Sequence, residues 1–170
     1  EDWSGDGNGL AGMQWLGGVS LSRYFDDRDT FPWGHFQDRF VVELGAGIGL
    51  TSIVLARLGA RVALTDMDVD KCQDTLADNL PASVVSGEAP RVGVHRLVWG
   101  ECGPEWPWGG ELPALVVAGD CVYEAACIPP LLRTMASLCS PSTEVVMCGI
   151  VGDHALALFR ALAPRLFSVR

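Results

Sequence analysis

Short apolar runs alternate with longer runs of helical periodicity along most of the chain, and this alternation limits the fold more than any other feature. The clearest apolar run, from Phe40 to Leu44, is followed by apolar residues at helical spacing from Leu50 to Leu58. Repetition of such a unit is typical of a parallel sheet, because each parallel strand pair needs a crossover connection, usually a helix. The sequence therefore predicts an α/β fold with a mostly parallel sheet and helices on both faces.

The individual elements follow from the same periodicities. Strands are predicted at residues 40–44, 61–66, 92–99, 114–118 and 143–148, and a sixth begins within 166–169. Helices are predicted at residues 10–25, 50–58 and 69–80, from Pro130 onward, and at 154–162 with Asp153 as the cap. Gly17 and Gly18 weaken the pattern of the N-terminal helix, since glycine is a poor helix former.

The chain forms one domain by its size. A chain of 170 residues buries enough surface to support a core without disulfides or metals. Residues 1–9 combine three glycines with three acids, so we expect this segment to be flexible and the ordered domain to span residues 10–170.

The charge is strongly acidic, at −9 with 12 basic and 21 acidic side chains. Most affinity for nucleic acid comes from Lys and Arg side chains that neutralise phosphates, so a nucleic-acid ligand is not expected. The charge favours a basic protein partner or a small molecule.

Cysteine and histidine are not spaced as metal ligands. The six cysteines form no C-x-x-C pair and the three histidines stand apart, so no metal site is predicted. With no apolar run near 18 residues, no membrane segment is predicted either. We interpret the cysteines as buried, reduced thiols of an intracellular protein.

A glycine-rich segment, Glu43-Leu-Gly-Ala-Gly-Ile-Gly49, lies where the first strand passes into the next helix. Glycines there let the backbone approach a ligand closely, and the helix N-terminus offers free N–H groups. The dinucleotide fingerprint G-x-G-x-x-G would need glycine where Leu50 stands. The Glu43 carboxylate instead suits the cationic amino-acid end of S-adenosylmethionine. A purely structural strand-to-helix turn is the alternative.

Further acids fall at the carboxyl ends of later strands, where ligands bind in such sheets. Asp66 can accept hydrogen bonds from both ribose hydroxyls, or it can act as a helix cap, a role for which Asp68 is better placed. Met67 can pack on an adenine ring or fill the core. Asp120 and Tyr123 follow the fourth strand, without the intervening prolines typical of enzymes that methylate nucleic-acid bases.

Four separated segments together resemble one family. They are Gly12-Met-Gln-Trp15, the glycine-rich segment through Leu50, Leu97-Val-Trp-Gly100 and Gly119-Asp-Cys-Val-Tyr123. On these residues the chain resembles the seven-β-strand protein-lysine methyltransferases of methyltransferase family 16, over residues 11–170. The resemblance implies a Rossmann-like class I methyltransferase fold and S-adenosylmethionine as the cofactor.

The resemblance also implies roles for single residues. Asp120 and Tyr123 would line the channel for the acceptor lysine and serve as the catalytic pair. The remaining residues would bind the cofactor: Trp15, Glu43, Gly45, Ala46, Gly47, Asp66, Met67, Trp99 and Gly119. Trp99 and Trp15 could instead be structural, as a cap on the sheet edge and as a core anchor.

The chain departs from the family in two places. Gly17 and Gly18 stand where helix-favouring residues are usual, so we expect a kinked or poorly ordered N-terminal helix. The sequence stops at Arg170, inside the predicted sixth strand, so the final antiparallel strand is missing and we expect a C-terminally truncated domain.

The sequence thus predicts a protein-lysine N-methyltransferase that acts as a monomer on a basic protein substrate, without nucleic acid or membrane. We expect it in the cytoplasm, with the nucleus as a second compartment. A non-catalytic S-adenosylmethionine-binding interaction module is the main alternative, followed by a small-molecule methyltransferase. The loop at residues 100–112, with Trp106 and Trp108, could grip a basic substrate or simply pack onto the domain.

Overall fold

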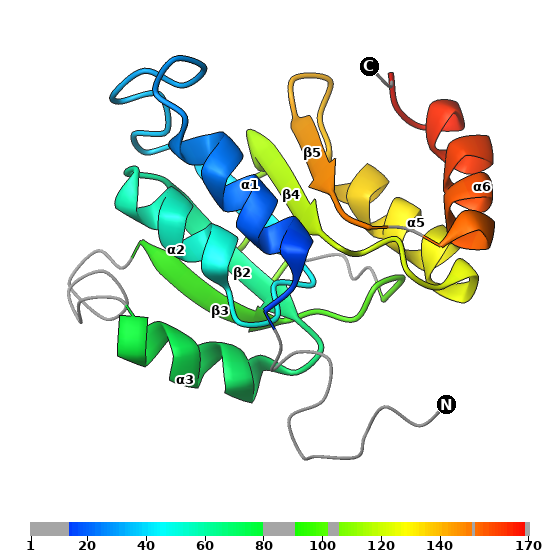
Figure 1. Ribbon diagram of the computed structural model, residues 1–170, viewed down its shortest axis with the longest axis horizontal. Coiled ribbons are helices and arrows are strands. Elements are labelled where there is room, and N and C mark those ends of the chain that lie inside the picture. The colour runs from blue at the N-terminus through cyan, green and yellow to red at the C-terminus, as the bar shows by residue number, and fades with distance from the viewer. Residues whose placement is uncertain (1–13, 80–90, 102–105, 151, 169–170) are drawn as a thin grey trace.

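The computed structural model describes residues 14–79, 91–101, 106–150 and 152–168 (Figure 1). Within them, five strands form one sheet in the order β3-β2-β1-β4-β5, and each pair of neighbours is parallel. The strands are β1 (Phe40–Leu44), β2 (Arg61–Asp66), β3 (Val92–Arg96), β4 (Leu115–Gly119) and β5 (Glu144–Cys148). The predicted parallel α/β fold is therefore confirmed.

Helices connect and cover these strands. They are α1 (Leu16–Asp26), α2 (Leu50–Arg57), α3 (Val69–Asn79), α5 (Ile128–Leu138) and α6 (Asp153–Leu162), with single 3-10 turns at η2 (Ala125–Cys127) and η3 (Ala163–Arg165). Figure 1 shows α1 and α2 on one side of the sheet and α5 and α6 on the other.

Alternating side chains of the central strand build a core on each face. In β1, Val41 packs in the cluster that includes Leu21 of α1 and Ile53 of α2. Its neighbour Val42 packs in the opposite cluster with Leu131 of α5. Both valines are 0% exposed, because a strand buried on two faces sends successive side chains into different cores.

The direction of strand addition reverses beside β1. The chain first builds outward from β1 through β2 to β3, and then returns to place β4 on the other side of β1. The carboxyl ends of β1 and β4 thus flank the topological switch point, where open α/β sheets bind their ligands.

Three local predictions are corrected. The N-terminal helix starts at Leu16 rather than near Leu10, and it runs without a break through Gly17 and Gly18. The side chain of Asp153 does not cap α6, since Gly152 is the N-cap residue and Asp153 lies in the first turn.

The predicted sixth strand is also wrong for the described residues 166–168. Pro164 lies within the η3 turn, and Phe167 packs against the core cluster that contains Val42 and Leu131. This segment therefore packs onto the domain as a turn. Residues 169–170 lie outside the described residues, as do residues 1–9 and their predicted flexibility.

The described cysteines carry free thiols, but only Cys121 is fully buried, while Cys127, Cys139 and Cys148 are half-buried. No helix in the described ranges has both the length and the apolar character needed to cross a membrane.

Candidate active site

The glycine-rich segment forms a tight turn between β1 and α2. Gly45, Gly47 and Gly49 have φ angles of 61°, 55° and 73°, the left-handed region that favours glycine. A Cβ at Gly45 would also stand 2.9 Å from both the Cys121 sulfur and a ring carbon of Trp99. Conformation and close packing therefore both require glycine at Gly45.

Glu43, at the end of β1, is a fully buried carboxylate beneath this turn. It accepts a hydrogen bond from the Ser52 N–H at 2.9 Å and another from the Ser52 hydroxyl. Burial raises the pKa of Glu43 to about 7, although the hydroxyl groups of Ser52 and Thr51 oppose the rise by favouring the charged form. Glu43 is thus poised between its neutral and charged forms, and a cation beside it would favour the charged one.

Asp66 ends β2 and braces the same turn. One of its oxygens accepts the Gly47 N–H at 2.9 Å and the other accepts the Asp68 N–H at 3.0 Å. Each carboxylate oxygen has a further lone pair, so Asp66 can still accept from a ligand hydroxyl. Asp66 is 8% exposed, while the adjacent Met67 is 67% exposed.

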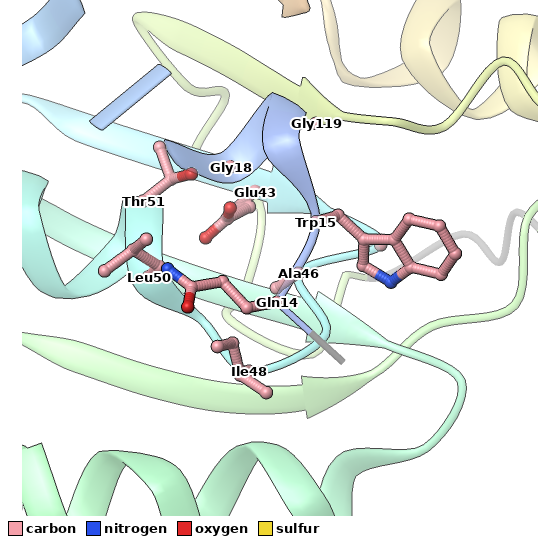
Figure 2. Close-up of a pocket in the computed structure, with 10 residues that line it drawn as sticks. Gln14, Trp15, Gly18, Glu43, Ala46, Ile48, Leu50, Thr51 and Gly119 are labelled. Carbon is pink, nitrogen blue, oxygen red and sulfur yellow. The ribbon is translucent and has the colours of Figure 1, made fainter. Parts of the chain in front are cut away.

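A small cavity of about 30 Å³ lies between the first turn of α1 and the glycine turn. In Figure 2 the Glu43 carboxylate points into it, whereas the Trp15 indole is directed away from the other labelled side chains. The residues that line it are Gln14, Trp15, Gly18, Glu43, Gly45, Ala46, Ile48, Leu50, Thr51 and Gly119.

Trp99 follows β3 and reaches the glycine turn from the other side. Its ring lies against Gly45, since a Cβ added at Gly45 would stand 2.9 Å from a ring carbon of Trp99. The Trp99 side chain also packs on the core cluster that contains Val42 and Leu131. The next residue, Gly100, donates its N–H to the Thr134 hydroxyl of α5 at 2.8 Å. Trp99 is therefore fixed between the core and the predicted cofactor site.

Asp120 and Tyr123 lie just beyond β4, at the same edge of the sheet. Asp120 accepts hydrogen bonds from the backbone of α1 and of the segment after β5. Tyr123 is 51% exposed, and burial of the other part raises the pKa of its phenol to about 12. The phenol is therefore a neutral hydrogen-bonding group near pH 7.

The fold brings most of the sequence-predicted residues together. Trp15, Glu43, Gly45, Ala46 and Gly119 line the cavity, and Gly47, Asp66 and Trp99 adjoin it through the contacts above. Met67, Asp120 and Tyr123 do not line it.

Sequence reasoning missed five lining residues: Gln14, Gly18, Ile48, Leu50 and Thr51. Their proximity to the glycine motif along the chain was one available signal for Ile48, Leu50 and Thr51. Gly18 carried a signal too, since a glycine pair inside a helix often marks a close approach.

The tryptophans of the loop after β3 pack onto the domain. Trp106 and Trp108 stack with their ring centroids 5.4 Å apart, and Trp108 also meets Phe40 at the start of β1 edge to face. Glu111 pairs with Arg61 at the start of β2. These contacts support the packing interpretation of this loop over the substrate-gripping one.

Comparison with known proteins agrees with this arrangement. Residues 2–152 match the family described as "Lysine methyltransferase". The chain is 32% identical over 161 residues to EEF1A lysine methyltransferase 3 of Mus musculus, covering 94% of this chain and 65% of that protein. It is 33% identical over 139 residues to protein N-lysine methyltransferase METTL21A of Danio rerio, covering 82% of this chain and 60% of that protein.

Solved structures show the same fold. The ribosomal protein L11 methylase of Lactobacillus delbrueckii subsp. bulgaricus superposes with a TM-score of 0.58 at 18% identity, over 86% of this chain and 66% of that one. Magnesium protoporphyrin IX methyltransferase of Synechocystis PCC 6803, solved with SAH bound, gives 0.50 at 20% identity, over 72% of this chain and 50% of that one.

Proposed function

Because the chain belongs to the lysine methyltransferase family, we propose that it transfers a methyl group from S-adenosylmethionine to a lysine side chain of a protein. The chain spans 65% and 60% of the lengths of the two relatives described above, so the activity, the substrate and the partners are all part of this proposal.

The observation that carries the proposal is the buried Glu43 carboxylate at the switch point of the sheet. A buried carboxylate needs a compensating positive charge or hydrogen bonds, and the ammonium of the cofactor's methionine end supplies both. The Thr51 hydroxyl beside it is buried and also lines the cavity. These oxygen acceptors fit the ammonium at the amino-acid end of S-adenosylmethionine in chemistry and in position.

The other predicted residues suit the remainder of the cofactor. Asp66 would accept hydrogen bonds from the ribose hydroxyls, and Met67 and Trp99 would flank the adenine. Gly119 has no side chain, so it would let the end of β4 approach the cofactor closely. The enclosed volume is about 30 Å³, well below the few hundred that a cofactor pocket needs. The exposed side chain of Gln14, which lines the cavity, would therefore move aside on binding.

When bound, the cofactor supplies a methyl group on a positively charged sulfur. The protein must hold the acceptor in line and exclude water, and it must favour the neutral amine of lysine, whose reference pKa is about 10.4. We assign the acceptor channel to the surface beside Tyr123. Burial and the nearby sulfonium charge would both lower the pKa of the amine.

The net charge of −9 favours a basic substrate. Glu124, next to Tyr123, is exposed at the carboxyl edge of the sheet. Arg61 and Arg91, at the opposite edge, are paired with Glu111 and Asp38. We therefore propose a lysine-bearing basic segment as the substrate, a monomeric enzyme, and a location in the cytoplasm and nucleus.

Incubation of the protein with labelled S-adenosylmethionine and a cell extract, followed by mapping of the label, tests the proposal. We expect methylated lysine in a basic protein. Binding of S-adenosylmethionine without transfer would instead identify a non-catalytic binding module, and the absence of binding would refute the cofactor assignment as well.

Calorimetry on a matched pair of variants locates the binding site. Asp66→Ala should weaken S-adenosylmethionine binding at least about tenfold, since it removes both the ribose acceptor and the brace of the glycine turn. Asp78→Ala, which removes an exposed carboxylate from the far end of α3, should leave the affinity unchanged.

A further inference from the structure

The Asp120 carboxylate joins three segments of the chain that are distant in sequence. The Gly17 N–H, in the first turn of α1 and 103 residues away, donates to Oδ2 of Asp120 at 2.5 Å. The Ile150 N–H, just after β5, donates to Oδ1 at 2.9 Å. The Asp120 N–H in turn donates to the Cys148 carbonyl at 2.8 Å, so Asp120 links α1, β4 and β5.

Glycines make this junction possible by removing side chains from its surface. A Cβ at Gly17 would stand 2.6 Å from Oδ2 of Asp120 and 2.7 Å from the Cys148 carbonyl oxygen. A Cβ at Gly119 would stand 2.9 Å from the Gly18 nitrogen, and one at Gly149 would stand 2.8 Å from the Asp120 Cα. Backbones from three elements thus meet at van der Waals distance around one carboxylate.

Asp120 has a left-handed backbone, with φ at 54°. Such a conformation costs free energy in any residue other than glycine, and it persists only where the surrounding contacts over-determine it. The hydrogen bonds on both carboxylate oxygens and on the N–H supply those contacts.

The junction also caps α1. The N-cap residue, Trp15, provides no side-chain cap, so the first N–H groups of the helix need acceptors from elsewhere. Asp120 accepts the N–H of the second helical residue, Gly17, which is the bond that a capping side chain normally makes. Its negative charge is also favourable at a helix N-terminus.

The first turn of α1 is one wall of the cofactor cavity. Trp15 and Gly18 line the cavity on either side of the clamped Gly17, and Gly119 lines it from β4. Loss of the hydrogen bond between Asp120 and the Gly17 N–H would let this turn of α1 move away from β4 and Glu43. The position of Asp120 therefore controls the shape of the cofactor site through a backbone contact.

We propose that Asp120 is a positioning residue that builds the S-adenosylmethionine pocket by clamping α1 onto β4 and β5. The proposal rests on the proposed function and adds to it a role for Asp120 in cofactor binding. It differs from the sequence-based prediction, in which the Asp120 side chain lines the acceptor-lysine channel.

The test compares Asp120→Ala with Asp153→Asn, which removes an exposed carboxylate from the start of α6 and touches none of these contacts. For Asp120→Ala we expect S-adenosylmethionine affinity to fall at least tenfold and KM for S-adenosylmethionine to rise by a similar factor. The kcat value at saturating cofactor should stay within a few-fold of the wild type. Asp153→Asn should match the wild type in every measurement.

Amide hydrogen exchange of the protein without cofactor provides a second readout. In Asp120→Ala the amides of Gly17 and Gly18 should exchange at least tenfold faster, while those of α5 keep their protection. Because this measurement needs no ligand and no activity, it tests the clamp even if the protein proves not to bind S-adenosylmethionine.

Gly17→Ala tests the same contact with the Asp120 carboxylate intact, and it covers the case in which Asp120→Ala fails to fold. We expect it to weaken S-adenosylmethionine binding as well. In Asp120→Ala, unchanged hydrogen exchange at the Gly17 amide would overturn the proposal. Wild-type cofactor affinity together with a collapsed kcat in Asp120→Ala would also overturn it, and would favour contact between Asp120 and the acceptor lysine.

Discussion

The glycine pair of α1 offers a sharp test of the packing seen here, because the two neighbours should respond to alanine in opposite directions. Both have helical surroundings, and helix propensity alone predicts that each substitution stabilises the protein by up to about 1 kcal/mol. The structure separates them. A Cβ at Gly18 meets nothing closer than the Thr51 hydroxyl at 3.9 Å, whereas a Cβ at Gly17 meets three atoms within 2.7 Å.

The size of the Gly17→Ala effect follows from three contributions. Overpacking of a close contact costs about 1–3 kcal/mol, and loss of a hydrogen bond to a charged carboxylate costs about 1.5–3 kcal/mol. The gain in helix propensity returns at most about 1 kcal/mol. We therefore expect a net loss of about 1.5–6 kcal/mol of unfolding free energy for Gly17→Ala, and a change between 0 and a gain of about 1 kcal/mol for Gly18→Ala.

Urea unfolding followed by circular dichroism measures both values at once. For a protein of this length, a loss of 2 kcal/mol also lowers Tm by about 4–8 °C. If Gly17→Ala proves as stable as Gly18→Ala, α1 does not pack against Asp120 and Cys148, and Asp120 does not hold α1 in place.

Two further predictions concern other parts of the chain. Because the folded pKa of Glu43 is raised to about 7 from an ordinary value of 4.5, folded Glu43 binds a proton that the unfolded chain releases, so its contribution to stability is complete below pH 4.5 and is lost as pH rises through 7. In cofactor-free protein, Glu43→Gln should reduce the fall of unfolding free energy with rising pH between pH 4.5 and 7.5, as measured by urea unfolding. A pH dependence equal to that of the wild type would contradict the raised pKa of Glu43. Trp108→Ala should lower the unfolding free energy by about 3 kcal/mol through lost packing on Phe40, without raising KM for the protein substrate. A raised KM at unchanged stability would restore the substrate-gripping interpretation of the loop.

Local patterns predicted the sheet well because each strand carries its own signal. The runs at β1 and β2 are almost wholly buried and therefore mostly apolar, and their predicted limits match the structure. The end of the chain shows the limit of this reasoning. The apolar residues Leu166 and Phe167 suggested a strand, but a short apolar run is equally suited to a turn packed on a core, and Pro164 favours the turn.

The candidate site was predictable where its residues follow a strand in the sequence or form a recognisable motif. Glu43, the glycine turn and Asp66 stand at strand ends, and the fold of parallel strands brings such ends to one edge. The residues that α1 contributes were harder to find, because a helix can approach the sheet at many positions. By helix propensity Gly17 and Gly18 predict a weak helix, whereas in the structure Gly17 packs directly against Asp120 and Cys148.

The sequence by itself determined the parallel α/β fold, the position of the glycine turn and the acidic character of the protein, since these depend on periodicity and composition that are local or additive. Only the tertiary structure decided which groups meet. The bond between the Gly17 N–H and Asp120 joins residues 103 positions apart, and it depends on the placement of α1 against the strand ends to within about 1 Å. A larger displacement breaks the hydrogen bond, and no local pattern encodes that placement.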